Sequence, residues 1–161
     1  MSAHPVGVGI GLTMTARLRG PATERHATHT FARDASEIAR ARRLVAATLR
    51  SWGVRVDQSA IVLLTSELMT NAIRHGEGVV RMVLRATDGR VRIEVHDAGA
   101  GMPGLRVGQL TGDGLGGFGL HVVAALADAW GVEHGAGTTV WAEKASTWPT
   151  QPDDEREPGP P

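Results

Sequence analysis

The sequence predicts an α+β protein, a two-layer sandwich in which about three helices lie over one face of a largely antiparallel mixed sheet. Three observations lead to this fold class. Two segments with helical periodicity come first. Two strands with alternating apolar and polar residues then flank an Asp-Gly turn, which is a hairpin signal. A third helix and one or two more strands follow, without the β-α-β alternation of a parallel sheet.

Two helices are predicted before the hairpin. The first covers residues 34–50, where Asp34 or Ser36 can cap its start, and the Trp-Gly pair at 52–53 ends it. The second covers residues 56–75, and its apolar side chains recur every three or four positions. Both helices therefore have one apolar face with which to cover a sheet.

The sheet is predicted mainly from the second half of the sequence. Residues 79–87 and 90–98 form the hairpin. After a glycine-rich stretch, residues 119–130 are predicted to be the third helix. Residues 130–144 then supply one or two closing strands. Three tryptophans fall beside apolar runs and are expected in the core: Trp52, Trp130 and Trp141.

The composition changes at both ends of the chain. Residues 1–26 are rich in Gly, Thr, Pro and Ala without a period, and a flexible leader is expected there. Residues 145–161 are rich in proline and acidic side chains, which predicts a disordered tail. One folded domain is therefore expected over residues 27–144.

Charge and composition exclude several classes of protein. Lys+Arg and Asp+Glu number 17 each, so no bulk charge attracts the protein to nucleic acid or to an anionic membrane, and neither is expected as a direct partner. The absence of cysteine excludes disulfides, thiolate metal sites and cysteine nucleophiles. The sequence has no secretory signal pattern, which makes a cytoplasmic location the expectation.

The stretch "DAGAGMPG" raises the question of a nucleotide. Gly99, Gly101 and Gly104 satisfy the spacing G-x-G-x-x-G, which in a dinucleotide-binding fold cradles a pyrophosphate. That motif must open a helix, however, and Met102, Pro103 and the glycines that follow prevent a helix from starting. A dinucleotide fold is therefore disfavoured, and a P-loop is excluded because no Gly-Lys-Ser/Thr occurs.

The second predicted helix carries a polar stripe. Glu67, Asn71 and His75 are four residues apart, so they share one ridge of the helix. A solvated face is the simplest interpretation of such a stripe. Because Glu67 and Asn71 interrupt the middle of an otherwise apolar helix, a general base and a Mg²⁺ ligand are the functional alternative.

Four short motifs together resemble one superfamily. "SELMTNAIRHG", "DAGAG", "GGFGL" and "GTTVWAE" occur in the order of the conserved boxes of Bergerat-fold ATPases, the superfamily of gyrase, heat-shock chaperone, histidine kinase and mismatch-repair ATPases. Within it, the sequence is most similar to the small bacterial anti-sigma-factor serine kinases, in the wording of the first motif and in the short lid. The resemblance implies the Bergerat fold, with ATP and Mg²⁺ as cofactors.

The resemblance also implies which residues face the base of the nucleotide. Asp97 would accept a hydrogen bond from the adenine amino group, which guanine lacks at that position. Gly99 and Gly101 would let the backbone approach the base and ribose. Thr138 or Thr139 would complete the hydrogen bonding at adenine, through water or directly.

A second set of residues is implied for the phosphates. Asn71 would hold Mg²⁺, and Glu67 would take the proton from the substrate hydroxyl as the catalytic base. Gly117 and Gly119 would bring the start of the third helix to the phosphates. Arg106, in the lid, is the nearby cation expected to steady the γ-phosphate.

By resemblance, the protein is expected to be a serine/threonine kinase and transcription regulator. It would sequester a sigma factor and phosphorylate a STAS-type anti-anti-sigma partner. A catalytically inactive ATP-binding module and a stand-alone histidine-kinase-type ATPase domain are the alternatives. A homodimer is expected, with its contact at the first helix and an early strand at residues 28–31.

Overall fold

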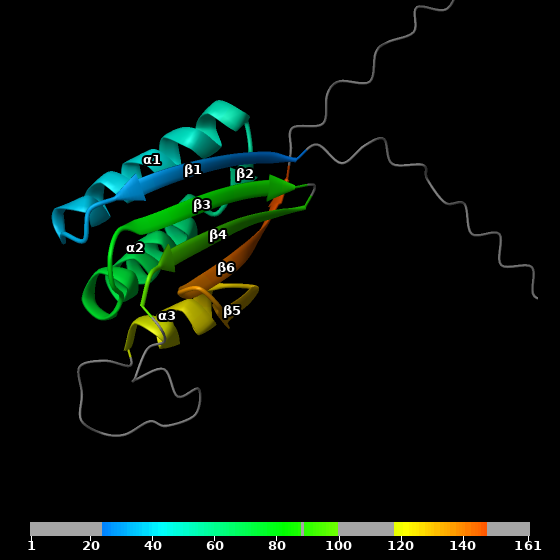
Figure 1. Ribbon diagram of the computed structural model, residues 1–161. Coiled ribbons are helices and arrows are strands. Elements are labelled where there is room, and N and C mark those ends of the chain that lie inside the picture. The colour runs from blue at the N-terminus through cyan, green and yellow to red at the C-terminus, as the bar shows by residue number, and fades with distance from the viewer. Residues whose placement is uncertain (1–23, 88, 100–117, 148–161) are drawn as a thin grey trace, which may run out of the picture.

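A computed structural model describes residues 24–87, 89–99 and 118–147, in which three helices cover one face of a six-stranded sheet (Figure 1). The predicted α+β two-layer fold is confirmed. In chain order, the elements are β1 (Arg25–Phe31), α1 (Ser36–Trp52), β2 (Arg55–Val56), α2 (Gln58–His75), β3 (Val80–Thr87), β4 (Arg90–Asp97), α3 (Phe118–Leu126), β5 (Ala129–His134) and β6 (Thr138–Thr147).

The sheet has the strand order β1-β3-β4-β6-β2, and β5 also pairs with β6. Every pairing among the described strands is antiparallel. The predicted hairpin is confirmed as β3 and β4, and Gly89 in its turn has a φ of 96°, which glycine adopts without strain. Asp97, the last residue of β4, pairs with Thr138, the first residue of β6.

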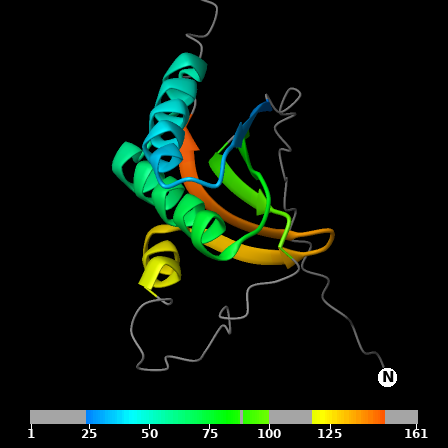
Figure 2. The same cartoon turned by 60° about the vertical axis from the view of Figure 1, so that its left-hand side comes forward.

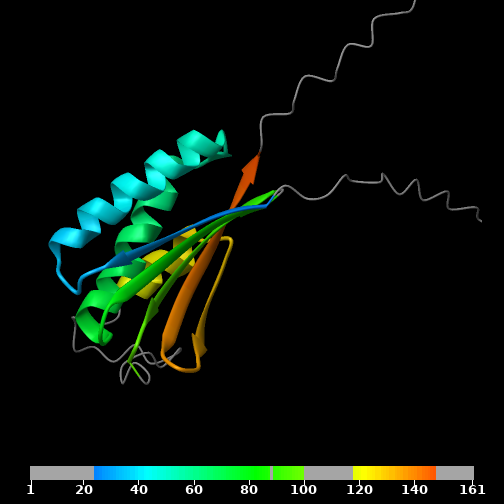
Figure 3. The ribbon, with the colours of Figure 1, turned by 45° about the horizontal axis from the view of Figure 1, so that its top comes forward.

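The core lies between the sheet and the helices, which occupy the same side of the sheet in two further views (Figures 2 and 3). Along β4, every second side chain is buried: Val91, Ile93, Val95 and Asp97. The facing helices bury residues at helical spacing, among them Val45 and Leu49 of α1 and Leu64 and Leu68 of α2. Asp97 is thus the polar end of an otherwise apolar strand face.

The helix ends explain where α1 and α2 begin and end. Gly53, with a φ of 71°, closes α1 in the left-handed conformation, as its Trp-Gly signal predicts. Asp57 caps α2 by accepting a hydrogen bond from the backbone N–H of Ala60 at 3.0 Å. The N-cap position of α1 is Ala35, so neither Asp34 nor Ser36 occupies it, although Asp34 Oδ1 accepts the backbone N–H of Ser36, the first residue of the helix, at 2.8 Å.

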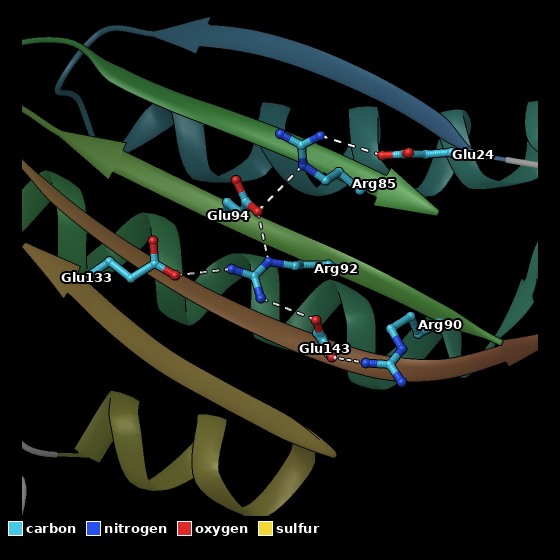
Figure 4. A network of polar contacts seen from close by, with 7 residues as sticks. All are labelled: Glu24, Arg85, Arg90, Arg92, Glu94, Glu133 and Glu143. Atoms are coloured by element: carbon cyan, nitrogen blue, oxygen red, sulfur yellow. Dashed lines mark hydrogen bonds and ion pairs between the residues drawn. The ribbon is translucent and has the colours of Figure 1, made fainter. Parts of the chain in front are cut away.

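The outer face of the sheet, opposite the helices, carries charges (Figure 4). Arg92 bridges the carboxylates of Glu94, Glu133 and Glu143, and its guanidinium stacks 3.9 Å from the centre of the Trp141 ring. The expectation that Trp141 belongs to the core is therefore wrong, whereas the other two tryptophans pack against the core. Strand alternation explains the difference, because the neighbours of Trp141 in β6 point inward.

Four elements depart from the sequence prediction. β1 begins at Arg25, inside the segment 1–26 predicted as a flexible leader. The third helix ends at Leu126 rather than at residue 130, because the backbone N–H of Asp128 bonds to the carbonyl of Glu143 and starts β5. β6 continues to Thr147, three residues into the segment predicted as the tail. The two-residue strand β2 has no counterpart in the sequence prediction. No helix within the described part of the chain is long and apolar enough to span a membrane.

Candidate functional site

The polar stripe of α2 meets the first turn of α3. Glu67 is half-buried, and Asn71 is 6% exposed. Gly119 lies against both side chains: a Cβ at this glycine would be 2.7 Å from Glu67 Oε2 and 3.5 Å from Asn71 Oδ1. The structure therefore brings together the predicted pair Glu67 and Asn71 under the start of α3. His75, the third member of the stripe, is exposed at the end of α2.

Asn71 has hydrogen-bonding capacity that the described part of the chain does not use. Its Nδ2 is buried and has no hydrogen-bond partner there. An unpaired amide inside a protein is costly and is rare in native structures. The amide of Asn71 thus has the properties of a group held in place for a ligand.

Asp97 forms a second polar centre, at the end of β4. It is 2% exposed, and its Oδ1 accepts backbone N–H groups of Gly99 at 2.8 Å and of Glu77 at 3.3 Å. These two bonds fix the carboxylate between the end of α2 and the turn after β4. Oδ2 has no hydrogen-bond partner among the described residues, which leaves an acceptor for a ligand.

Glycines from three segments pack against Asp97, two of them on its side chain and one on its backbone. A Cβ at Gly76 would be 2.7 Å from Asp97 Cβ and 2.5 Å from the carbonyl oxygen of Ala72, and one at Gly99 would be 2.8 Å from Asp97 Oδ1. A Cβ at Gly137 would collide with the backbone carbonyl of Asp97. Sequence reasoning missed Gly76 and Gly137 as site residues. The Gly76 carbonyl also accepts a hydrogen bond from Arg33.

The two threonines predicted near adenine lie on opposite faces of the sheet. Thr138 is buried, and its hydroxyl donates to the Gly99 carbonyl at 3.1 Å, beside Asp97. Thr139 points to the outer face, where its Oγ1 lies 3.1 Å from Nδ1 of His96. The alternation of side chains along β6 thus brings only Thr138 to the Asp97 centre.

The last turn of α2 connects the two centres. Asn71 is followed by Ala72, and the carbonyl of Ala72 lies close to Gly76 at the end of the helix. Gly76 in turn packs against the side chain of Asp97. The remaining predicted site residues, Gly101, Arg106 and Gly117, lie outside the described residues.

A carboxylate at the end of a buried strand, with a glutamate and an asparagine on the helix beneath it, is the arrangement implied by the Bergerat-type motifs. The chain belongs to the histidine kinase-like ATPase domain family, whose model matches residues 31–144. ATP is therefore the nucleotide that this family membership implies.

A solved structure with the same fold is "The crystal structure of the RsbU and RsbW domains of Rv1364c from Mycobacterium tuberculosis". The match has a TM-score of 0.54 and 24% sequence identity, and it covers 79% of this chain and 34% of that one. The chain thus spans about a third of the length of this relative. No match was found among curated proteins.

The described side chains fit a magnesium ion that arrives with a nucleotide. No group of three or more His, Cys, Asp or Glu side chains within the described ranges is placed to hold a metal. Mg²⁺ in nucleotide sites takes one or two protein oxygens and otherwise phosphates and water. The buried amide of Asn71 can supply one such oxygen, with Glu67 beside it.

Proposed function

We propose that this protein is an ATP- and Mg²⁺-dependent regulator of the anti-sigma-factor type, which binds a sigma factor and phosphorylates a serine or threonine of a STAS-type partner. The observation that carries the proposal is the placement of Glu67 and Asn71 together beneath Gly119. The resemblance of the four motifs supplies the partner class. A cytoplasmic location accords with such partners.

In this proposal, the Asp97 centre selects adenine. Oδ1 of Asp97 is engaged by two backbone N–H groups, so Oδ2 is the oxygen that accepts the adenine amino group. Guanine has a carbonyl at the corresponding position and would place an acceptor against the carboxylate. The hydroxyl of Thr138 would hold the Gly99 turn in place through its hydrogen bond to the Gly99 carbonyl.

The centre formed by Glu67, Asn71 and Gly119 handles the phosphates. The first N–H groups of α3 have no acceptor within the helix, and such groups attract anionic oxygens. Bound Mg²⁺ would neutralise phosphate charge, and the Asn71 oxygen would orient it. The Glu67 carboxylate would take the proton from the substrate hydroxyl, whose oxygen then attacks the γ-phosphorus while the bond to ADP breaks. Arg106 is the proposed partner of the γ-phosphate.

Replacement of Asn71 by alanine tests the metal half of this proposal. We expect the variant to bind ATP as wild type does in EDTA, but to lose most of the gain in affinity that Mg²⁺ gives wild type, because the ion loses its protein ligand. Titration calorimetry with and without Mg²⁺ measures both quantities. Thr70→Ala, at the neighbouring half-buried position of α2, is the matched control. An undiminished Mg²⁺ effect in Asn71→Ala would remove the residue from the metal site.

A homodimer through β1 is a further part of the proposal. In the described part of the sheet, β1 pairs only with β3, so its other edge is open to pairing across a two-fold axis. Thr28 and Thr30 are exposed there, whereas Phe31 is buried in the core.

We expect light scattering at micromolar concentration to give the mass of a dimer for wild type. The double variant Thr28→Lys/Thr30→Lys should give the mass of a monomer, because like charges would face each other across the axis. Retained ATP binding would show that the variant is folded. A monomeric wild type with ATP present would contradict the dimer.

A further inference from the structure

The C-terminal end of α3 is fastened to β6 by one lysine. The ammonium group of Lys144 donates to the carbonyl oxygen of Leu126 at 2.8 Å and to Asp128 Oδ1 at 2.9 Å. Asp128 Oδ2 in turn accepts the backbone N–H of Ala145 at 2.6 Å. We call Lys144 and Asp128, with these bonds, the α3 clamp.

The clamp suits the chemistry of a helix end. The last carbonyls of a helix have no partner within it and carry partial negative charge, so a cation there is favourable. The hydrogen bond from Lys144 holds the pKa of Asp128 below its usual value. Since the pair is partly exposed, its main effect is orientation rather than stability.

α3 is a short helix that packs mainly against α2, and the clamp fixes its C-terminal end. It has nine residues, and from Gly119 to Leu126 the fully buried side chain is that of Val123, with Leu120 and Leu126 partly buried against the core. Its other end carries Gly119, in contact with Glu67 and Asn71. A rotation of the helix about Val123 would therefore move Gly119 relative to these two side chains. Figure 2 shows α3, in yellow, beside the end of α2.

We infer that Lys144 is a positioning residue for the phosphate half of the nucleotide site: by anchoring one end of α3, it sets the place of the other end over Glu67 and Asn71. The inference rests on the proposed function. The clamp contacts α3 directly, whereas Asp97 and Thr138 lie at the opposite end of the β4–β6 pair from Lys144. Loss of the clamp should therefore affect phosphate binding and leave adenine binding intact.

The test compares two ligands on two variants. For Lys144→Met, which keeps the length of the side chain and removes its charge, we expect the affinity for Mg-ATP to fall by about threefold to thirtyfold. Its affinity for adenosine should stay unchanged. Lys144→Arg, which keeps the cation, should restore most of the ATP affinity. Arg85→Met is the matched control, because it removes the ion pairs that an exposed arginine of β3 forms with Glu24 and Glu94, and β3 does not pair with β6.

A second measurement works without nucleotide. Hydrogen exchange of the amides of residues 122–126, the first of α3 that can bond within the helix, should be faster in Lys144→Met than in wild type, while exchange in α2 stays the same. Unchanged exchange in α3, or equal losses of ATP and adenosine affinity, would overturn the inference. Faster exchange in α3 of a protein that binds no ATP would support the clamp and contradict the proposed function instead.

Discussion

Replacing Glu67 by alanine is expected to lower the rate of phosphoryl transfer to the partner by about 10² to 10⁴ and to leave ATP affinity nearly unchanged. A general base acts only while the hydroxyl proton leaves, so its loss affects the transfer step and not the binding of ATP. The position of Glu67 supports this separation. Its carboxylate touches Gly119, at the proposed phosphate end of the site, and lies one helical turn from the proposed metal ligand Asn71.

Single-turnover transfer of labelled phosphate, together with calorimetric ATP affinity, measures the two quantities. Glu67→Gln keeps the shape and hydrogen-bonding groups without the basic oxygen, and it should be as slow as Glu67→Ala. Glu133→Ala, on the outer face of the sheet, is the matched control and should transfer at the wild-type rate. A Glu67→Ala protein with wild-type transfer would contradict the assignment of the base. A wild type that binds ATP and transfers nothing would indicate an inactive binding module.

Asp97→Asn is expected to weaken ATP binding by about tenfold to a hundredfold, the cost of leaving buried hydrogen-bonding groups mismatched. Asp97 is enclosed between the end of α2 and the Gly99 turn. An amide there presents two N–H donors, so either it loses an N–H group of the backbone or it faces the adenine amino group with a donor. Discrimination between ATP and GTP should fall in parallel.

Calorimetry with both nucleotides measures this change, and Asp57→Ala separates it from a general loss of stability. Asp57 caps α2 at the end remote from Asp97, so its replacement should cost about 1 kcal/mol of stability without touching the site. Suppose that Asp57→Ala and Asp97→Asn have equal melting temperatures, and that only Asp97→Asn binds ATP weakly. The loss of affinity is then a direct effect on the nucleotide site and not a consequence of lower stability. Unchanged affinity in Asp97→Asn would remove Asp97 from adenine recognition.

Local patterns predicted most of the fold. The periodicity of α1 and α2 and the Asp-Gly turn of the β3-β4 hairpin are signals within short stretches, and the structure confirms these elements. β2 escaped prediction because two residues cannot show alternation, and it exists only by pairing with the end of β6. The end of α3 was misplaced because a distant backbone group, the carbonyl of Glu143, decides it.

The candidate site shows the same difference between features that one short segment encodes and features that depend on contacts between segments. The pairing of Glu67 with Asn71 follows from their spacing on one helix. The choice between Thr138 and Thr139 needed the strand register, which shows that Thr138 lies opposite Asp97. The role of Gly137 arises where β6 passes the backbone of Asp97, a contact between segments that no short motif reports.

The glycines around Asp97 limit how the protein can vary by descent. Gly76, Gly99 and Gly137 come from three separate segments, and a methyl group at any of them would press on Asp97. The acid is therefore enclosed largely by main chain, which single mutations do not reshape. Among the described residues, the side chains next to the carboxylate offer little means of adjusting the preference for a base. A descendant protein that came to bind a different nucleotide base would therefore first have to replace Asp97 itself.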